Sequence, residues 1–502
     1  MIAPVHVRKL FAVLAAGLVV LAGCTPAPAP DGTPSPTVVL PDFDPFAGLD
    51  VENGRSEVVR DPVYLDYGNA SLDVLAYGLD LAWDPTTEVL AGVATLLIRA
   101  VTDVSEITLD FSDQYTVDSA ALNGTPVTPE WDGSDLRVPY ELDADERVTL
   151  VVSYRGTPEP VPLPSRRGDA FEGLGLRVTE DGYLWTMQEP YGASTWFPVN
   201  ELPSDEAVYD IRVTVPEGLG AVASGAFLGE TPVQESVVWP GRDGHARTFH
   251  WRSTDPVAAY LTTLAIGEYT MISDESEDGI PLTYWLRTGR DDDLERVMRR
   301  SPELLAWLTE RFGPYPFPTG GVVVVDSMSA METQQMITFG GQIGATGDNS
   351  AAEVLLHEYA HQWFGNAVTP TDWTGLWLNE GWAMYCEMLW LVDEGLVTED
   401  RIIDWAYSVD SRSRAAAGPP GDFDPDRFAE SNVYVGPALM LHAIHREIGD
   451  EAFFALGRDW VQERRNTHVD RAEFTAFVNE HTGRDFTALI DLWLDSPTTP
   501  PR

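Results

Sequence analysis

Short runs of apolar residues, separated by turn residues, dominate the first half of the chain. Such runs, with polar or turn-forming residues on either side, are typical of β-strands. They occupy residues 94–98, 106–111, 136–138, 148–152, 211–215, 221–224 and 248–251. Between them, Asn123-Gly124 and Asp132-Gly133 are dipeptides that favour tight turns. The pattern predicts an all-β domain over residues 49–267, built as a sandwich or a saddle-like sheet.

The periodicity changes after this domain. One more pair of strands is expected around residues 282–286, and a β-branched run at 322–325 predicts another strand. Residues 291–312 repeat apolar positions every three to four residues, so they predict one amphipathic helix. The rest of the chain has a mainly helical pattern. The chain is therefore expected to be a multidomain α+β protein, with a second, mainly helical domain over residues 268–502.

The first residues read as a targeting segment rather than as part of a folded domain. Arg8 and Lys9 precede an apolar run of 12 residues, at 10–21, which is too short to span a bilayer as a helix. The run ends in Leu-Ala-Gly-Cys, which resembles the lipobox of bacterial lipoproteins. This resemblance implies a signal peptide over residues 1–23, whose cleavage leaves Cys24 as a lipidated first residue.

A tether is expected next, over residues 24–48. Seven prolines fall within residues 25–45, so this stretch should be extended and semi-rigid. Acyl chains on Cys24 insert into a bilayer at about 0.8 kcal/mol per buried methylene group. The folded part is therefore expected to be lipid-anchored outside a bacterial membrane. No other segment has the pattern of a membrane span.

The charge and composition exclude several classes of protein. Acidic residues outnumber basic ones by 79 to 32, which gives a formal net charge of −47. Nucleic acid is an improbable partner for such a chain, because phosphate binding needs clustered Lys and Arg. The 16 Trp and 19 Phe exclude a disordered acidic chain. With only Cys24 and Cys386 present, neither a disulfide framework nor a cysteine-based metal site is expected, and Cys386 should be a buried apolar residue.

The strongest chemical signal is the sequence His-Glu-Tyr-Ala-His at residues 357–361. Positions four residues apart lie on one face of a helix, so His357 and His361 can bind one metal ion. Glu358 lies beside them, where it can take a proton from an attacking water molecule. The sequence therefore predicts the metal site of a hydrolase.

Signals at helix ends place the motif on a helix and suggest a third ligand. Ser350 and Glu353 have the spacing of a capping box at the N-terminal end, and Gly365 suits the C-terminal end. A second helix is predicted to have Asn379 as its N-cap and Glu380 in its first turn. A zinc hydrolase needs three protein ligands and one open position. Glu380, with 18 residues between it and the second histidine, is the candidate third ligand.

This arrangement resembles a known family. His-Glu-x-x-His, followed after 18 residues by a Glu in the context Leu-Asn-Glu-Gly, resembles the M1 family of zinc aminopeptidases, which follow the gluzincin pattern. The resemblance implies one zinc ion per chain, held by His357, His361 and Glu380, with Glu358 as the general base. It also implies a thermolysin-like catalytic domain behind the β domain, in a two-domain form of the family.

Two segments upstream resemble the parts of the family that bind the substrate's α-amino group. Residues 329–333, Ser-Ala-Met-Glu-Thr, resemble the motif Gly-x-Met-Glu-Asn, and Glu332 stands at its amine-binding position. A buried ammonium group needs such a carboxylate partner. Residues 188–198 resemble the segment by which the β domain reaches the active site. There Glu189 and Gln188 are expected as further amine-binding groups, with an exposed loop pair as the alternative.

Downstream, residues 433–439, Val-Tyr-Val-Gly-Pro-Ala-Leu, resemble the family's tyrosine segment. The resemblance implies that Tyr434 donates a hydrogen bond to the oxyanion that forms during attack. Because proline is tolerated in the first turn of a helix, Pro437 predicts a helix start near Gly436. Glu387, seven residues beyond the third ligand, is a candidate acceptor for the outer N–H of a ligand histidine, with plain packing as the alternative.

The resemblance implies a zinc metalloaminopeptidase that acts on peptides with a free N-terminus. One alternative is a metal-dependent endopeptidase, which would also cleave N-acetylated peptides. The other is a lipoprotein that binds peptides or partners without catalysis. The intact set of His357, Glu358, His361, Glu380 and Tyr434 favours catalysis. Peptides, and the membrane through the lipid anchor, are the expected partners.

Overall fold

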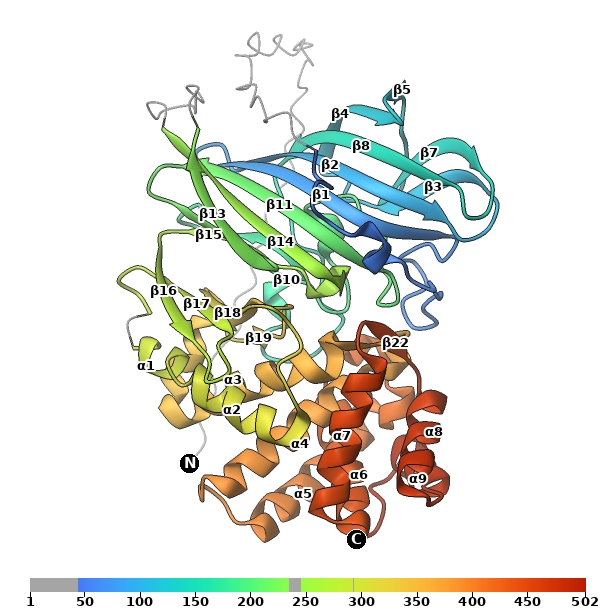
Figure 1. Ribbon diagram of the computed structural model, residues 1–502, viewed down its shortest axis with the longest axis vertical. Coiled ribbons are helices and arrows are strands. Elements are labelled where there is room, and N and C mark those ends of the chain that lie inside the picture. Colours follow the sequence, from blue (N-terminus) through green and yellow to red (C-terminus); the bar gives the residue numbers. More distant parts are fainter. Residues whose placement is uncertain (1–43, 234–244, 292) are drawn as a thin grey trace, which may run out of the picture. The chain divides into compact units, whose positions relative to one another are not determined.

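The computed structural model describes residues 44–233, 245–291 and 293–502 (Figure 1). The expected signal peptide, the lipidated Cys24 and the tether up to residue 43 lie outside these residues. Among the helices within the described ranges, none combines the length and the apolar character that crossing a membrane requires.

An eight-stranded sheet dominates the first half of the described chain. Its strand order is β13-β14-β11-β1-β2-β8-β4-β5, and only β1 and β11 are parallel neighbours. All 13 residues of β1 are buried, as expected for a central strand that is covered on both faces. The strands are β1 Leu72–Asp84, β2 Val89–Ala100, β4 Tyr115–Leu122, β5 Thr125–Val127, β8 Arg147–Gly156, β11 Glu206–Pro216, β13 Ala226–Pro232 and β14 Ala246–Ala258.

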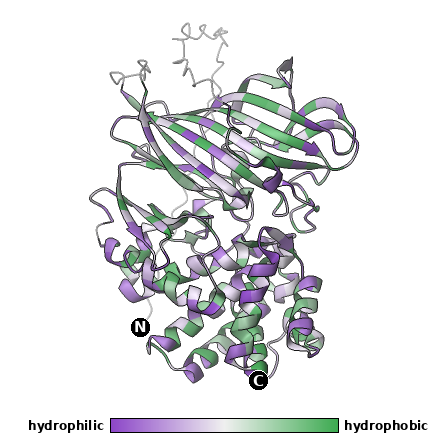
Figure 2. Cartoon of the chain, viewed as in Figure 1, coloured by the Kyte–Doolittle hydropathy of each residue, from purple (hydrophilic) through white to green (hydrophobic). Residues whose placement is uncertain are grey.

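Two smaller sheets complete this β-rich half. Their strand orders are β3-β7-β6 and β12-β15-β10-β9. Partly exposed and buried positions alternate along β2 and β8, and Figure 2 shows hydrophobic and hydrophilic residues mixed along the strands of this half. Each apolar run of the sequence coincides with a strand, so the prediction of an all-β first half is confirmed. The strands are β3 Val104–Asp110, β6 Glu130–Asp132, β7 Asp135–Leu142, β9 Gly175–Val178, β10 Leu184–Met187, β12 Gly220–Ala223 and β15 Leu264–Gly267.

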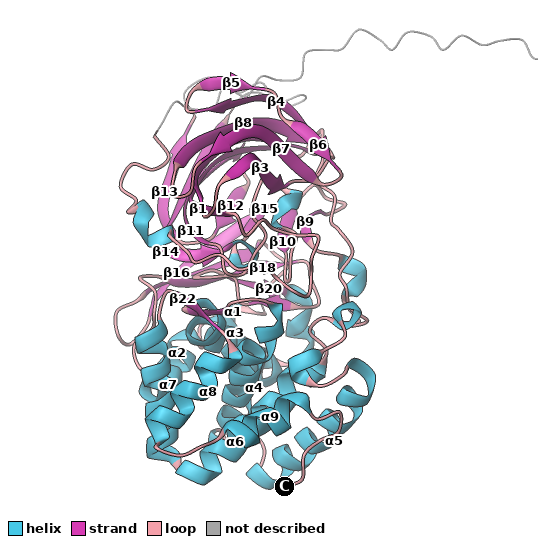
Figure 3. Ribbon diagram, turned by 90° about the vertical axis from the view of Figure 1, so that its right-hand side faces the viewer, coloured by secondary structure: helices cyan, strands magenta, loops and turns pink. Residues whose placement is uncertain are grey.

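The second half begins with a five-stranded mixed sheet in the order β16-β17-β18-β20-β19. Its middle strand is fully buried, and β19 forms an edge. Most of the helices follow this sheet and group together (Figure 3). The strands are β16 Tyr269–Glu275, β17 Pro281–Arg287, β18 Gly320–Val325, β19 Ala330–Met331 and β20 Ile337–Gly340, and a separate parallel pair is β21 Val368–Pro370 with β22 Thr467–Val469.

The helices of the described residues pack around α3, α4 and α6, and they enclose a second hydrophobic core. Together with the β-rich half, they confirm the predicted fold class. The helices are α1 Glu295–Met298, α2 Ser301–Phe312, α3 Asp348–His361, α4 Leu376–Asp393, α5 Glu399–Ala417, α6 Ser431–Ile448, α7 Asp450–Arg464, α8 Arg471–Thr482 and α9 Thr487–Asp495.

Several predicted helix ends are wrong. The expected helix over 291–312 is two helices, α1 and α2, because a proline at the start of α2 lacks the N–H that a continuous helix requires. The expected capping box is also absent. Helix α3 begins at Asp348 after Gly347, so Ser350 and Glu353 lie inside the helix, where they line a cavity.

The starts of α4 and α6 also differ from the prediction. Helix α4 begins at Leu376, so Asn379 is not its N-cap and Glu380 lies in the second turn. Helix α6 begins at Ser431 and continues through Pro437. This proline packs against Gly381 of α4, where an added Cβ would come within 2.5 Å of the proline Cβ. Close packing of the two helices therefore offsets the hydrogen bond lost at the proline.

A buried carboxyl group in the central sheet gives the protein a pH-dependent stability. Neither oxygen of Asp80 has a hydrogen-bond partner among the described residues. Burial raises the pKa of Asp80 to about 7, although Arg212 opposes the rise. The folded state therefore keeps this proton to a higher pH than the unfolded chain does. The resulting stabilisation is complete below about pH 4 and is lost as the pH rises through the folded-state pKa.

The variant Asp80→Asn should show a weaker dependence of stability on pH than the wild type. Between pH 5 and pH 8, its free energy of unfolding should change by about 2–3 kcal/mol less than that of the wild type, measured by urea denaturation. The variant Asp143→Asn, which changes an exposed carboxylate, should keep the wild-type dependence. Equal pH dependence in Asp80→Asn and in the wild type would contradict the assignment.

Candidate active site

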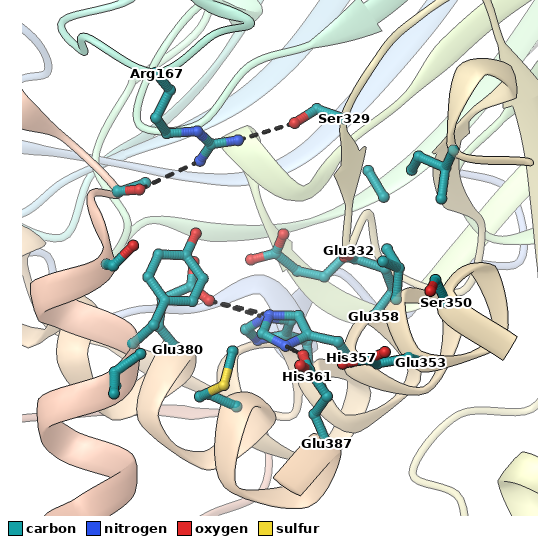
Figure 4. A pocket seen from close by; sticks show the side chains of 18 of the residues that line it. Arg167, Ser329, Glu332, Ser350, Glu353, His357, Glu358, His361, Glu380 and Glu387 are labelled. Carbon is teal, nitrogen blue, oxygen red and sulfur yellow. Dashed lines mark hydrogen bonds and ion pairs between the residues drawn. The ribbon is translucent and has the colours of Figure 1, made fainter. Parts of the chain in front are cut away.

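Two packed helices bring together three potential metal ligands. His357 and His361 lie one turn apart on α3, and Glu380 lies on α4. Both histidine Nε2 atoms lie 3.3 Å from Glu380 Oε2, and the three ligand atoms are all within 4.8 Å of one another. All three side chains are buried, and Figure 4 shows them grouped at one side of the cavity. Two imidazole nitrogens and one carboxylate oxygen form the donor set of a zinc hydrolase, so these residues fit a zinc ion.

The charges of these groups favour a cation between them. Burial opposes protonation, yet contacts with Glu380 and Glu387 raise the pKa of His357 well above its usual range. The pKa of His361 is also raised, despite burial, by Glu332 and Glu380. Burial opposes ionisation of Glu380, but hydrogen bonds to the two histidines hold its pKa well below the usual range. The carboxylates keep the buried imidazoles protonated because their negative charge is stabilised by positive charge nearby. A divalent metal ion supplies that positive charge and displaces the protons from the imidazoles when it binds.

The turn after α3 orients the second histidine. Gln362–Asn366 forms a π-helical turn, in which Gly365 has a φ of 128° that favours glycine. The Nδ1 atom of His361 lies 3.1 Å from the carbonyl oxygen of Phe364. When Nδ1 donates its hydrogen to that oxygen, Nε2 keeps a free lone pair for the metal. Gly365, expected at the helix end, therefore helps to set the orientation of a ligand.

A cavity of about 870 Å³ opens beside the three ligands, and Glu358 lines it from the same turn of α3. Burial raises the pKa of Glu358 to about 8, although the two neighbouring histidines oppose the rise. A carboxyl group with a pKa near neutrality can accept a proton from water and give it up again within one turnover. The geometry therefore places a suitable general base next to the metal ligands.

Two further carboxyl groups, Glu189 and Glu332, line the same cavity from opposite halves of the chain. Glu332 is buried and Glu189 is partly buried, and each has one buried oxygen without a hydrogen-bond partner among the described residues. Burial raises the pKa of both groups, and repulsion by Glu332 raises that of Glu189 further. An ammonium group between them would satisfy both unpartnered oxygens and remove the repulsion. The pair thus forms a candidate site for a primary amine.

Hydrogen bonds fix the segment that carries Glu332. It directly follows β19, the edge strand of the five-stranded sheet. Its backbone carbonyl accepts hydrogen bonds from Gln362 Nε2 at 2.9 Å and from Asn366 Nδ2 at 2.7 Å. Both donors belong to the turn after α3, so the amine-binding carboxylate and the metal ligands are held in one framework.

The structure contradicts the expectation that Gln188 binds the substrate amine. This side chain is fully buried and does not line the cavity. Its Nε2 donates to the carbonyl oxygens of Ala259 at 2.9 Å and Thr262 at 3.0 Å, and its Oε1 accepts from Trp196 Nε1 at 2.9 Å. Both ends of the amide are therefore engaged within the β-rich half. Gln188 supports the segment that presents Glu189.

Tyr434 enters the cavity from the first turn of α6. Its ring stacks on that of His357, with ring centroids 5.9 Å apart and 24° between the planes. Burial and the charge of Glu380 raise the pKa of Tyr434 well above its usual range. The phenol therefore stays protonated at neutral pH, and it can donate a hydrogen bond to an oxygen that gains negative charge beside the metal ligands.

Glu387 lies where the sequence suggested a partner for a ligand histidine. Its Oε2 is 3.2 Å from His357 Nδ1, although this contact lacks the alignment of a full hydrogen bond. Glu387 also lines the cavity, as does Glu353 one turn before His357 on α3. Cys386, next to Glu387, is buried and free, as expected for an apolar core residue.

Sequence reasoning missed Arg167, which is the one Arg or Lys among the described residues that line the cavity. Its Nη2 lies 2.6 Å from Asp169 Oδ2 and 2.9 Å from Ser329 Oγ, and its Nη1 lies 3.5 Å from the carbonyl oxygen of Ala429. The guanidinium thus connects the loop before β9 with the segment before β19 and with the residues that precede α6. No local motif marks it as part of the cavity, because Ser329 and Ala429 lie far away in the sequence.

Comparison with known proteins finds relatives among the M1 peptidases. A model of the peptidase family M1 domain matches residues 297–493. The chain is 28% identical to Aminopeptidase M1 of Arabidopsis thaliana, in a match that covers 61% of this chain and 36% of that protein. It is 24% identical to Aminopeptidase N of Acetobacter pasteurianus, over 62% of this chain and 88% of the relative. Its match to Aminopeptidase 2 of Candida albicans spans less than half of that protein, 43%.

Solved structures show the same architecture. The M1 zinc metallopeptidase from Deinococcus radiodurans is 27% identical and superposes with a TM-score of 0.77, covering 88% of this chain and 98% of the other. A mutant of that enzyme bound to a Tyr-Ser-Ala substrate gives the same identity and TM-score, with 88% and 99% covered. The similarity therefore extends over both the β-rich and the helical halves.

Proposed function

Because this chain belongs to peptidase family M1, we propose that it is a zinc-dependent aminopeptidase that removes residues one at a time from the N-terminus of peptides. The observation that carries the proposal is the position of Glu189 and Glu332. Each of these carboxyl groups has one buried oxygen without a hydrogen-bond partner among the described residues, and both line the same cavity as the three candidate zinc ligands. A substrate held by its ammonium group there presents its first peptide bond to the catalytic groups.

The residues of the cavity divide the chemistry among them. His357, His361 and Glu380 would hold the zinc ion, which would supply a Lewis acid for the peptide carbonyl and lower the pKa of water. Glu358 accepts the proton of the attacking water and delivers it to the leaving amine. Tyr434 donates its O–H to the oxyanion of the tetrahedral intermediate. The residues therefore provide a base, an oxyanion donor and a fixed substrate end.

The experiment that tests this function compares leucine p-nitroanilide with its N-acetylated form. The zinc content of the protein is measured in the same sample. The free amine should be hydrolysed, and acetylation should abolish turnover, because the acetamide carries no charge for the two carboxylates. An endopeptidase would cleave an N-acetylated peptide, so efficient cleavage of such peptides would favour that alternative instead.

The cellular location is part of the same proposal. A signal peptide over residues 1–23 and lipid on Cys24 place the enzyme on the outer side of a bacterial membrane, where it acts on extracytoplasmic peptides. The motif at residues 21–24 and the proline-rich stretch that follows support this location. The variant Cys24→Ser should move from the membrane fraction to the soluble fraction after expression in a bacterium. An unchanged membrane association would rule out the lipid anchor.

A further inference from the structure

We propose that Glu353 and Glu387 form an acidic subsite beyond the metal ligands, which selects a cationic side chain, Lys or Arg, at the second residue of the substrate. This inference rests on the proposed aminopeptidase function, and it adds to that function a preference that the metal and amine sites do not determine.

The position of Glu353 along α3 places it beyond the first peptide bond. Glu353, His357 and His361 follow one another at intervals of four residues on one face of this helix. Glu332 is held near the C-terminal end of this row of three residues, because its backbone carbonyl accepts hydrogen bonds from the turn after α3. Glu353 lies at the other end, about 12 Å from His361 along the helix axis. A peptide that starts at Glu332 and crosses the row at the histidines therefore reaches Glu353 with its second residue (Figure 4).

The acidic pair has no arginine or lysine to neutralise it. Both carboxyl groups line the cavity, and burial together with the charge of Glu387 raises the pKa of Glu353 to about 8. Among the described residues, the one cationic group paired with Glu387 is His357, and no Arg or Lys forms an ion pair with either carboxylate. An ammonium or guanidinium group placed between the two carboxylates would offset the repulsion between their negative charges.

Apolar side chains beside the pair suit the stem of Lys or Arg. Val354 follows Glu353 directly, and Met384 precedes Glu387 by three residues on the same face of α4. Both line the cavity. Lys and Arg side chains pack their methylene groups along apolar surface while the charged end reaches a polar partner. An apolar wall that ends in two carboxylates therefore distinguishes arginine from a neutral side chain of the same shape.

The test compares the tripeptides Leu-Arg-Gly and Leu-citrulline-Gly, which differ at the second residue by charge but hardly by shape. The wild-type zinc enzyme should hydrolyse the arginine peptide with a kcat/KM about tenfold higher. Leucine p-nitroanilide, which has no second side chain, is assayed in parallel. If the wild type hydrolyses the anilide but treats both peptides alike, the subsite is refuted and the aminopeptidase function stands. If it hydrolyses none of the three, both proposals fall.

Two variants with the same change in charge assign the preference to a residue. In Glu353→Gln the ratio of kcat/KM between the arginine and citrulline peptides should fall towards 1. A general loss of activity would lower both values equally and leave this ratio unchanged. Glu430→Gln is the matched control, because Glu430 lines the same cavity but lies 3.8 Å from Arg427. It should keep the wild-type ratio. An unchanged ratio in Glu353→Gln, or an equal fall in both variants, would overturn the assignment.

A binding measurement gives a readout that does not depend on turnover. Titration calorimetry on the zinc-loaded Glu358→Gln variant should give a lower Kd for Leu-Arg-Gly than for Leu-citrulline-Gly, by a similar factor. Adding Glu353→Gln to that variant should remove the difference. Equal affinities for the two peptides before the second substitution would contradict the proposed subsite.

Discussion

Replacing Glu358 by Gln should lower kcat by about a thousandfold while the zinc content stays at one ion per chain. The side chain lines the cavity beside the metal ligands but is not one of them. Gln keeps the size and the hydrogen-bonding capacity of the residue, but it cannot accept the proton of the attacking water. Binding of zinc and of the substrate amine involves other residues, so the loss should fall on kcat rather than on KM.

Two measurements distinguish this result from a simple loss of metal. Zinc content, measured by atomic absorption after dialysis, should match that of the wild type in Glu358→Gln and should fall in His361→Ala. Leucine p-nitroanilide hydrolysis should be nearly lost in both variants. Near-normal turnover by Glu358→Gln would show that another group acts as the base, and loss of zinc from this variant would assign the residue to metal binding instead.

The central part of the metal site could be predicted from the sequence because its geometry is local. His357 and His361 are four residues apart, and one helix turn places them on the same face whatever surrounds them. Glu380 could be proposed only from the need for a third ligand and from the family resemblance, since no rule of local structure brings a residue 19 positions later into contact with them. The strands of the β-rich half could be predicted from their apolar runs for the same reason as the two histidines. Each run depends on the burial of one strand and not on which strands lie next to it.

The errors arose where tertiary packing overrides local preference. Pro437 should end or begin a helix by its own chemistry, yet α6 continues through it because Gly381 allows the two helices to approach closely. Ser350 and Glu353 have the spacing of a capping box, but the helix starts earlier and turns them towards the cavity. When a residue pattern suits either a helix cap or a cavity wall, the residues packed against it determine which role it takes. The local sequence does not show those residues.

The same reasoning explains the two differences at the cavity wall. Gln188 and Glu189 are adjacent in the sequence, and only the course of the backbone determines which one faces the substrate. Arg167 is joined to the rest of the cavity through Ser329 and the carbonyl of Ala429, both more than 160 positions away. Side chains on loops between the two halves therefore needed the structure to be assigned.

Replacing Tyr434 by Phe should lower kcat about 100-fold and leave KM nearly unchanged. The aromatic ring that stacks on His357 is retained in this variant, so the position of the metal ligands should be preserved. What is lost is a single O–H donor. Burial and the charge of Glu380 raise the pKa of this phenol well above its usual range, so the donor is present throughout the neutral pH range. Its contribution grows as the carbonyl oxygen becomes negative, which is why the effect should fall on the chemical step.

The affinity for a tetrahedral analogue separates this role from a structural one. A phosphonamidate peptide, which mimics the charged intermediate, should bind Tyr434→Phe much more weakly than the wild type, whereas the affinity for a product amino acid should hardly change. The variant Tyr385→Phe is the control, because this hydroxyl lies 2.7 Å from His445 Nδ1 and does not line the cavity. It should keep most of the activity. A kcat of Tyr434→Phe within threefold of the wild type would leave zinc as the main oxyanion partner, because no other phenol among the described residues lines the cavity.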